Sequence, residues 1–484
     1  MAFYNCINLE ELKIPATLTD VSTSVFYNCM KLKLDVKDNI HIGYADNMLL
    51  TNQRKSLSDY FGNDPNKDLV IPDGVETVGY SIFKEKQLRS VLFNGRTLTS
   101  ISPSAFYKCT LESVTLSANL NFIGKRCFQE CPNLKRVEFS NNQVLTAIPK
   151  YCFYNCPQLT NIVLPSSITT INEYAFGSCP NINEIGLSAT QIQTIGTFAF
   201  ADSSIANCDN GKNLLSLDYG AFINSKVQSV TISTRSISEK CFYNCFYLTS
   251  VTLDNNIDSI EASAFEGCLL LREFVIPSSL TVIKSFAFRS CESLYKVSLS
   301  LNSVLSEIYG GAFIRCPLLV SIKLDQSDSS YRFSNGALTN HEETKLITFL
   351  PSSPIDTYVV PMTTTSIGNY AFMSCTHLVR ILFSGNNIQS IGRESFKDCS
   401  KLAFLFITST SLSTIGDCAF DNSPLLRKCG AVRCDSSKTD LFIQRNIPEI
   451  SFRMNCSNTQ ITCLQQPVSS THVSILLISP FILM

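Results

Sequence analysis

Several residue types that support common protein functions are scarce in this chain of 484 residues. It contains no tryptophan and only 4 histidines, and charged residues make up 16%, below the roughly 25% of average domains. The 39 basic and 40 acidic residues nearly cancel, leaving a formal net charge of −1. Binding to nucleic acid or to an anionic membrane surface therefore has no electrostatic support, and we expect no nucleic-acid partner.

Motifs for catalysis, metal binding or cofactor binding are also missing. The sequence has no Gly-x-Ser-x-Gly, no phosphate-cradling glycine-rich loop, and no second histidine that would complete a metal site with His341. The Cys-x-x-x-Cys pairs at 127/131, 152/156 and 241/245 have helical spacing but lack a second pair of ligands. We therefore expect no enzyme activity, no metal and no cofactor.

Long hydrophobic runs are absent as well. The start, MAFYNCINLEEL, lacks the basic segment and following apolar segment of a signal peptide. The last twelve residues, 473–484, are rich in apolar side chains, but they include Pro480 and are too short to span a bilayer. A truncated membrane anchor and a disordered tail both fit this segment, so membrane association stays open.

The sequence contains sixteen variants of the motif Ala-Phe-x-x-Cys. The motif phenylalanine stands at positions 3, 26, 83, 106, 128, 153, 176, 200, 222, 242, 265, 288, 313, 372, 396 and 420. Successive copies lie 20 to 25 residues apart, except for two gaps of 57 and 59. Because a unit of this length cannot bury a core alone, the copies must stack, and the sequence predicts a repeat solenoid.

The copy around Phe288 shows the expected local structure. Ala287, Phe288, Cys291 and Leu294 follow a helical rhythm, which predicts short helical turns. Val297-Ser-Leu299 then alternates as a short strand does, and stacked copies predict a parallel sheet with rungs about 4.8 Å apart. An aliphatic residue precedes the phenylalanine by five positions, and the glycine that often follows it predicts a tight turn.

The 21 cysteines suggest either disulfides or a core column. Twelve of them occupy one repeat position, three residues after the phenylalanine: Cys6, Cys29, Cys109, Cys131, Cys156, Cys179, Cys245, Cys268, Cys291, Cys316, Cys375 and Cys399. Neighbouring rungs would bring their Cα atoms within disulfide range. However, the position is taken by Lys86, Ser203, Ser225 and Ser423 without paired loss, which favours small buried free thiols.

The two long gaps hold similar inserts, near residues 36–70 and 325–360. Met48-Leu-Leu-Thr-Asn52 aligns with Gly336-Ala-Leu-Thr-Asn340. Each segment is followed by polar residues and a second apolar run, which predicts a hairpin. Whether the hairpins bind a partner or only decorate the stack stays open.

The pattern Leu-x-x-Val-x-Leu-Pro-x-x-Leu-x-x-Ile-Gly-x-x-Ala-Phe-x-x-Cys resembles the BspA-like subclass of leucine-rich repeats over about residues 2–431. Proteins of that subclass occur on bacterial surfaces and are expanded in mucosal protist parasites. The resemblance implies a leucine-rich repeat superhelix, surface display, and adhesion or binding to host or matrix proteins. It supplies no catalytic residues.

The repeat rhythm weakens after Leu426, where Cys429 and Ala431 take the expected strand positions. We therefore expect two parts: a solenoid of about 16 repeats over residues 1–431 and a non-repeat tail over residues 432–484. Outward strand positions are mostly neutral and hydroxyl-rich, but the last rungs carry Leu382, Phe404 and Phe406 beside Arg380. Exposed aromatics next to arginine are typical of interfaces, so these four residues are the predicted partner-binding site. Alternatively, residues 432–460 fold back and cover them as a cap.

These features together predict a non-enzymatic surface for protein binding and adhesion, displayed at the cell surface. Its partner would be a protein ligand, with host and matrix proteins as candidates. The alternative is a cytoplasmic leucine-rich repeat scaffold for protein–protein interaction. That alternative is supported by the missing signal peptide and by the expected free thiols. The oligomeric state stays open.

Overall fold

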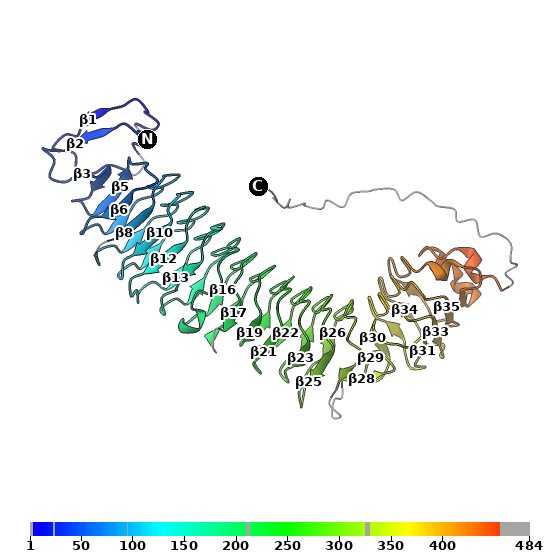
Figure 1. The fold of residues 1–484 in the computed structure, drawn as a ribbon. Coiled ribbons are helices and arrows are strands. Elements are labelled where there is room, and N and C mark those ends of the chain that lie inside the picture. The colour runs from blue at the N-terminus through cyan, green and yellow to red at the C-terminus, as the bar shows by residue number, and fades with distance from the viewer. Residues whose placement is uncertain (1–2, 23–24, 94, 210–212, 325–329, 455–484) are drawn as a thin grey trace.

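The computed structural model describes residues 3–22, 25–93, 95–209, 213–324 and 330–454. Figure 1 shows their rungs stacked side by side in one elongated, curved body, from β1 (Glu11–Lys13) at one end to β37 (Val432–Cys434) at the other. Outside the two inserts, strands of neighbouring rungs pair in parallel, and the pairing is divided into several successive sheets along the stack. The predicted repeat solenoid is confirmed.

Nearly every rung places one short strand on a first face of the stack, and the rung of Phe176 carries the 3-10 turn η1 (Leu187–Ala189) there instead. These strands carry the Val-x-Leu pattern that the sequence predicted, in which alternate residues point outward and into the core. They are β1, β2 (Lys33–Asp35), β6 (Asp68–Ile71), β8 (Ser90–Phe93), β10 (Ser113–Leu116), β12 (Arg136–Phe139), β14 (Asn161–Ile162), β17 (Asn207–Asp209), β19 (Ser229–Ile232), β21 (Ser250–Leu253), β23 (Glu273–Ile276), β25 (Lys296–Leu299), β27 (Ile322–Lys323), β31 (Thr357–Val360), β33 (Arg380–Phe383), β35 (Phe404–Ile407) and β37.

A second face carries parallel strands of two residues that the sequence did not predict. Each ends on the aliphatic residue five positions before the phenylalanine. They are β7 (Thr77–Val78), β9 (Ser100–Ile101), β11 (Phe122–Ile123), β13 (Ala147–Ile148), β15 (Thr170–Ile171), β16 (Thr194–Ile195), β18 (Ser216–Leu217), β20 (Ser236–Ile237), β22 (Ser259–Ile260), β24 (Val282–Ile283), β26 (Glu307–Ile308), β32 (Ser366–Ile367), β34 (Ser390–Ile391) and β36 (Thr414–Ile415). The inward aliphatic side chain of each strand is therefore fixed by a ladder, as on the first face.

The Ala-Phe-x-x-Cys segment forms the third side of each rung. The sequence predicted short helical turns here, and the structure has isolated hydrogen-bonded turns and no helix in the described residues of these segments. In the Phe106 rung, the N–H groups of Ser104, Phe106 and Lys108 donate to carbonyls of the next rung at 2.8–3.0 Å. Ser104 and Lys108 both have φ of 57°, a left-handed conformation that interrupts a helix. The alternate N–H groups of this segment thus bond to the next rung and not to carbonyls one helical turn back in the same segment.

This left-handed pair recurs two residues before and two residues after the repeat phenylalanine. The later position is often Asn, Asp or Gly, the residues that tolerate positive φ best. Residues of these types at the later position are Asn5, Asn28, Asn155, Asp202, Asn224, Asn244, Gly267, Asp398 and Asn422. That enrichment is visible in the sequence and predicts a left-handed turn, so it is the signal that the helical interpretation missed.

Glycine follows the second-face isoleucine because the neighbouring rung comes close, and not because a tight turn requires it. A Cβ atom on Gly392 would lie 2.5 Å from the backbone N of Asn369, and one on Gly416 would lie 2.4 Å from the backbone N of Arg393. Real Cβ contacts are not this short, so only glycine fits at these rungs. Lys284 and Glu261 occupy the same repeat position elsewhere, so the close approach is specific to certain rungs.

The core is a column of phenylalanine rings that runs along the stack. From Phe83 to Phe313 each ring stacks on the next, with centroids 4.7–5.6 Å apart and interplanar angles of 1–16°. Buried side chains form three clusters, within residues 14–61, 48–350 and 337–447. The clusters meet at the two inserts, so the inserts divide the solenoid core into three parts.

The cysteine column is confirmed as free thiols, of which eleven are buried in the core and Cys6 is partly exposed, and the structure supplies a reason for cysteine there. The thiol of Cys291 donates to the carbonyl of Phe265 in the preceding rung at 3.2 Å, and Cys131 contacts Phe106 O at 3.0 Å in the same way. The Ser423 hydroxyl makes the equivalent bond to Phe396 O at 2.6 Å. A small donor at this position can therefore bond that carbonyl, as the cysteines and Ser423 do, whereas the buried Ser203 hydroxyl has no hydrogen-bond partner among the described residues.

We expect Cys291→Ser to change the free energy of unfolding by less than about 1 kcal/mol, because the hydroxyl retains the donor and the size. Cys291→Val should cost about 1–3 kcal/mol, since it removes one of the two hydrogen bonds that Phe265 O accepts, leaving the one from Cys268 N, and adds a methyl group to a packed column. Chemical denaturation of the two variants beside the native chain measures the difference. Equal losses for Ser and Val would contradict a hydrogen-bonding role for this position.

Both inserts are hairpins that end in the stack, as predicted. The first contains β3 (Gly43–Ala45), β4 (Met48–Thr51) and β5 (Ser56–Tyr60); the second contains β28 (Tyr331–Ser334), β29 (Ala337–Asn340) and β30 (Lys345–Phe349). Met48 pairs with Tyr60 and Ala337 pairs with Phe349, so the two inserts match one residue away from the sequence alignment. Tyr60 contacts Phe83 with a tilted ring, and Phe349 stacks on Phe372, which joins each hairpin to the phenylalanine column.

A buried carboxylate lies where the first hairpin joins the stack. Asp59 accepts N–H groups from Tyr60 at 2.9 Å and from Phe26 at 3.3 Å. Burial raises the pKa of Asp59 to about 6, and burial also lowers the pKa of Lys86, which occupies the cysteine position of the next rung. Lys86 thus takes the cysteine position in the rung after the first hairpin, whereas Cys375 keeps it in the rung after the second.

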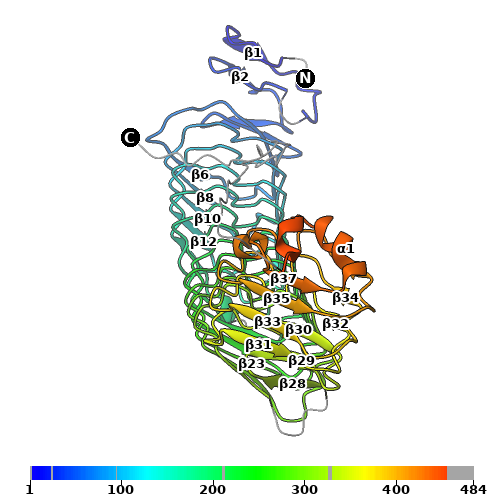
Figure 2. The same ribbon diagram turned by 90° about the vertical axis from the view of Figure 1, so that its right-hand side faces the viewer.

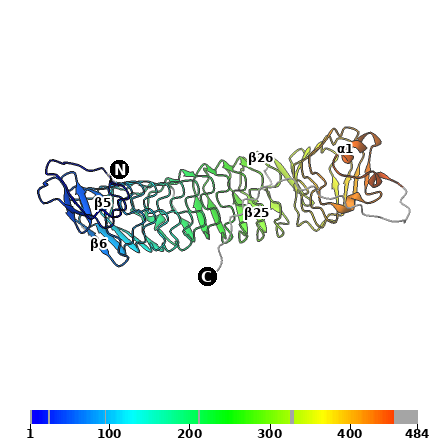
Figure 3. The ribbon, with the colours of Figure 1, turned by 90° about the horizontal axis from the view of Figure 1, so that it is seen from above.

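The C-terminal end of the stack is closed by residues 435–454. They contain η4 (Ser436–Lys438), α1 (Thr439–Ile443) and η5 (Glu449–Phe452), and Figures 2 and 3 show α1 at this end of the body. Phe442 is buried and stacks on Phe420 at 5.6 Å, which extends the ring column by one position. The division of the chain at residue 431 stays a prediction, and the apolar run at 473–484 lies outside the described residues.

Candidate protein-binding surface

The structure places the four predicted site residues on two neighbouring strands of the first face. Arg380 and Leu382 lie on β33, and Phe404 and Phe406 lie on β35. The parallel register pairs Arg380 with Phe404 and Leu382 with Phe406, so the four side chains form two adjacent rows. Arg380 is exposed, and the other three are partly exposed. This arrangement follows from strand alternation. Ile381 and Leu405 are buried in the core, so the residues on either side of each point outward.

Two further residues join these rows on the flanking strands. Val359 on β31 pairs with Leu382 and is 53% exposed, and Arg433 on β37 pairs with Phe406. The Arg433 guanidinium lies 5.8 Å from the centroid of the Phe404 ring, within cation–π distance. We call Val359, Arg380, Leu382, Phe404, Phe406 and Arg433 the C-terminal patch.

Val359 could not be identified from the repeat spacing, because β31 follows the second insert and lies outside the regular period. Arg433 could not be identified either, because the repeat spacing places the last strand positions at Cys429 and Ala431. In the structure the strand begins three residues later, and Val432 pairs with Leu405. The short helix η3 (Pro424–Arg427) and the left-handed Gly430 take up the additional residues. With this strand register, Arg433 points outward beside Phe406.

The positive charges of the C-terminal patch have no carboxylate partner in the described part of the chain. Arg380 Nε donates to the Thr357 hydroxyl at 3.0 Å, and neither Arg380 nor Arg433 lies within 4.0 Å of an acidic oxygen among the described residues. The predicted cap contributes Arg433 to the patch, whereas Phe442 and Ile447 are buried against the end of the core. The patch thus combines apolar side chains with uncompensated cations.

The described residues contain no cluster of three or more potential metal ligands. The Cys127/Cys131 and Cys152/Cys156 pairs lie in the core, where burial raises the pKa of Cys127, Cys131 and Cys152 well above that of a free thiol. Thiols held protonated are poor metal ligands. Within the same residues, no helix has the length and hydropathy needed to cross a membrane.

Comparison with solved structures gives three similar leucine-rich repeat proteins. One from Bacteroides ovatus is 23% identical, covers 66% of this chain and 80% of its own, and has a TM-score of 0.44. A leucine rich cell surface protein from Faecalibacterium prausnitzii is 19% identical, with coverage of 83% and 94% and a TM-score of 0.32. The pneumococcal vaccine antigen PcpA is 15% identical, with coverage of 79% and 74% and a TM-score of 0.31. No curated protein matches.

The family model described as "BspA type Leucine rich repeat region (6 copies)" matches residues 1–45, 57–147, 146–268, 216–347 and 347–469. These segments cover most of the chain and include every rung of the phenylalanine column. The chain therefore belongs to the BspA-type leucine-rich repeat family.

Proposed function

We propose that this protein is a non-enzymatic binding and adhesion surface displayed at the cell surface, with the C-terminal patch as a site for a protein ligand. The observation that carries the proposal is the in-register row of Val359, Leu382 and Phe406, bordered by Arg380 and Arg433. Apolar and aromatic anchors next to arginine supply most of the binding energy in protein interfaces. A leucine-rich repeat solenoid offers such a row on a rigid, extended support.

The uncompensated cations indicate the chemistry of the ligand. Arg380 and Arg433 flank the apolar row and form no ion pair with the described residues, so an apolar ligand segment bordered by Asp or Glu would complement them. Arginine favours carboxylates because its guanidinium can make two parallel hydrogen bonds. Host and matrix proteins are the candidate ligands, as the resemblance implied.

The alternative function is a cytoplasmic scaffold for protein–protein interaction. The twelve free thiols of the cysteine column support it, because free cysteines in this number are common in reducing compartments. Their burial weakens this argument, since a thiol such as Cys268 is not exposed to an oxidant in either compartment. The two functions share the binding surface and differ in location.

Location is tested on intact cells of the source organism. An epitope tag between Gln53 and Arg54 lies in an exposed turn of the first hairpin and avoids the buried strands on either side. Surface display predicts staining without permeabilisation and loss of that staining after mild protease treatment. Staining that requires permeabilisation would establish the cytoplasmic scaffold instead.

Ligand binding is tested with the full chain and immobilised extracellular matrix proteins. Phe404→Ser combined with Phe406→Ser should weaken binding by about 2 kcal/mol or more, which is roughly thirtyfold, because both anchors are lost. The matched control is Val275→Ser, since Val275 on β23 is an outward first-face residue that is 56% exposed. Unchanged binding by a double variant of native stability would remove the C-terminal patch from consideration.

A further inference from the structure

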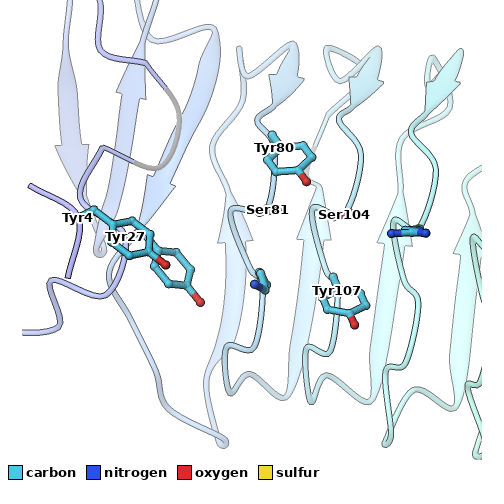
Figure 4. A pocket seen from close by; sticks show the side chains of 8 residues that line it. Tyr4, Tyr27, Tyr80, Ser81, Ser104 and Tyr107 are labelled. Atoms are coloured by element: carbon cyan, nitrogen blue, oxygen red, sulfur yellow. The ribbon is translucent and has the colours of Figure 1, made fainter. Parts of the chain in front are cut away.

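A hollow lies near the opposite end of the solenoid from the C-terminal patch, on the side formed by the Ala-Phe-x-x-Cys turns. It has a volume of about 300 Å³, which is at the lower end of the range for small-ligand sites. Its walls include the side chains of Tyr4, Tyr27, Tyr80 and Tyr107. Figure 4 shows Tyr4 and Tyr27 side by side, with Tyr80 and Tyr107 on the rungs that follow. We call this hollow the tyrosine pocket.

The pocket exists because two rungs carry serine where later rungs carry an aromatic ring. Ser81 and Ser104 line the pocket from the position two residues before the repeat phenylalanine. The same position holds Tyr151, Tyr174 and Phe198 further along, and those rings stack on one another at 5.1 and 4.9 Å. That ladder covers its own ring faces, whereas the serines leave open space between the tyrosines of the pocket.

Two cations also line the pocket, and no acidic side chain does. The Lys84 ammonium lies 5.8 Å from the ring centroid of Tyr27 and 6.0 Å from that of Tyr107. The Arg126 guanidinium lies 5.5 Å from the Tyr151 ring, which fixes its orientation, and it forms no ion pair with the described residues. An arginine stacked on an aromatic ring holds its planar guanidinium in an orientation that can bind an anion such as a carboxylate.

Acidic residues nearby reduce this positive charge only in part. Glu85 accepts from the Tyr27 hydroxyl at 3.3 Å and lies 3.9 Å from Lys84. Glu130 accepts from the Tyr107 hydroxyl at 3.3 Å and pairs with Lys108 at 3.5 Å. These hydrogen bonds orient the two tyrosine hydroxyls, and they leave the charge of Arg126 unpaired among the described residues.

We propose that the tyrosine pocket binds an acidic saccharide, a pyranose ring that carries a carboxylate or sulfate. One face of a pyranose exposes C–H groups that pack on tyrosine rings, and its hydroxyls match the tyrosine and serine hydroxyls around them. Its acidic group would reach Arg126 and Lys84. A phosphotyrosyl peptide would also match the charge, but the hydroxyl-rich lining and the small volume favour the saccharide. The site is independent of the C-terminal patch.

The test is titration of the full chain with sialyllactose and with a sulfated heparin disaccharide, using lactose as the uncharged comparison. We expect saturable binding of at least one acidic sugar, no binding of lactose, and weakening of the acidic interaction at high salt. Combined Lys84→Gln and Arg126→Gln should reduce the affinity about tenfold or more, because charge-assisted hydrogen bonds are lost. Lys240→Gln, at the repeat position of Arg126, is the control.

A second variant closes the pocket without removing a charge. Ser104→Tyr should fold, because Ser104 and Tyr151 share the repeat position and the backbone angle, with φ of 57° and 58°. The new ring would fill the hollow and abolish binding, whereas Ser263→Tyr, at the same position with φ of 56°, should leave binding intact. Absence of binding to both acidic sugars, equal binding of lactose, full affinity in Ser104→Tyr, or preference for a phosphotyrosyl peptide would each overturn the proposal.

Discussion

Replacing Phe288 by alanine is expected to lower the free energy of unfolding by about 3–5 kcal/mol, the largest loss among the substitutions considered. The Phe288 ring is fully buried between Phe265 at 5.4 Å and Phe313 at 5.5 Å, and Phe274 meets its edge at 4.6 Å. Alanine would remove these contacts and leave a cavity, because the surrounding backbone is held by ladders on three sides and cannot collapse.

The loss should also be local, since each rung contacts only its neighbours. Hydrogen exchange measured by mass spectrometry should show faster exchange near residues 265–316 and little change near residues 83–153. The control is Phe198→Ala, because Phe198 belongs to the half-buried surface ladder and should cost less than half as much. A loss spread evenly over the array, or equal losses for the two variants, would contradict the column as the main source of stability.

Adding a single methyl group at Gly392 should also destabilise the solenoid strongly. Gly392→Ala is expected to cost about 1–3 kcal/mol, because its Cβ would meet the backbone of Asn369 and Gly368 at 2.5 Å. Backbone atoms cannot rotate away as a side chain can, so the two rungs must separate and lengthen the hydrogen bond from Gly392 N to Ile367 O, now 2.9 Å. Thermal unfolding of the variant measures the cost.

The matched control for Gly392→Ala is Lys284→Ala at the same repeat position in another rung. Lys284 already carries a Cβ, so its truncation should change stability by less than about 0.5 kcal/mol. If Gly392→Ala were as harmless as the control, glycine would serve a different purpose here, and the close approach of the rungs would not explain its presence.

The architecture could be predicted from the sequence because every repeat has the same apolar side chains to bury. One Ala-Phe-x-x-Cys segment is ambiguous, but sixteen copies at nearly constant spacing require a stacked core whatever the local conformation. The cysteine column could be predicted for the same reason, since Ser225 and Ser423 replaced cysteine without any paired loss. The inserts were visible as interruptions of the period.

The local conformation was harder to predict from the spacing. Ala287, Phe288 and Cys291 have helical spacing, yet Phe286 and Ser290 have φ of 63° and 58°, so the segment turns twice and does not coil. A helix would satisfy its own N–H groups, whereas this segment donates them to the next rung, for example Phe288 N to Ala312 O at 2.9 Å. Inter-rung bonding outweighed the periodicity of the apolar residues.

The two candidate sites were also predictable from the sequence only in part. Phe404 and Phe406 could be identified on an outward strand because alternation along a strand is a local property. Val359 and Arg433 join them only through strand register across an insert and an irregular last rung, and the sequence does not contain that register. The tyrosine pocket depends on Ser104 facing Tyr27 and Arg126, residues that are far apart in the sequence.

The sequence by itself determined that this chain is a stack of about 23-residue rungs with a phenylalanine and cysteine core, because a strict period allows no other way to bury those side chains. The tertiary structure decided which glycines admit no side chain, which arginines lack a partner, and where a missing ring leaves a hollow. Those properties depend on the distance between neighbouring rungs, and that distance is set by the packing of whole rungs and not by any one of them.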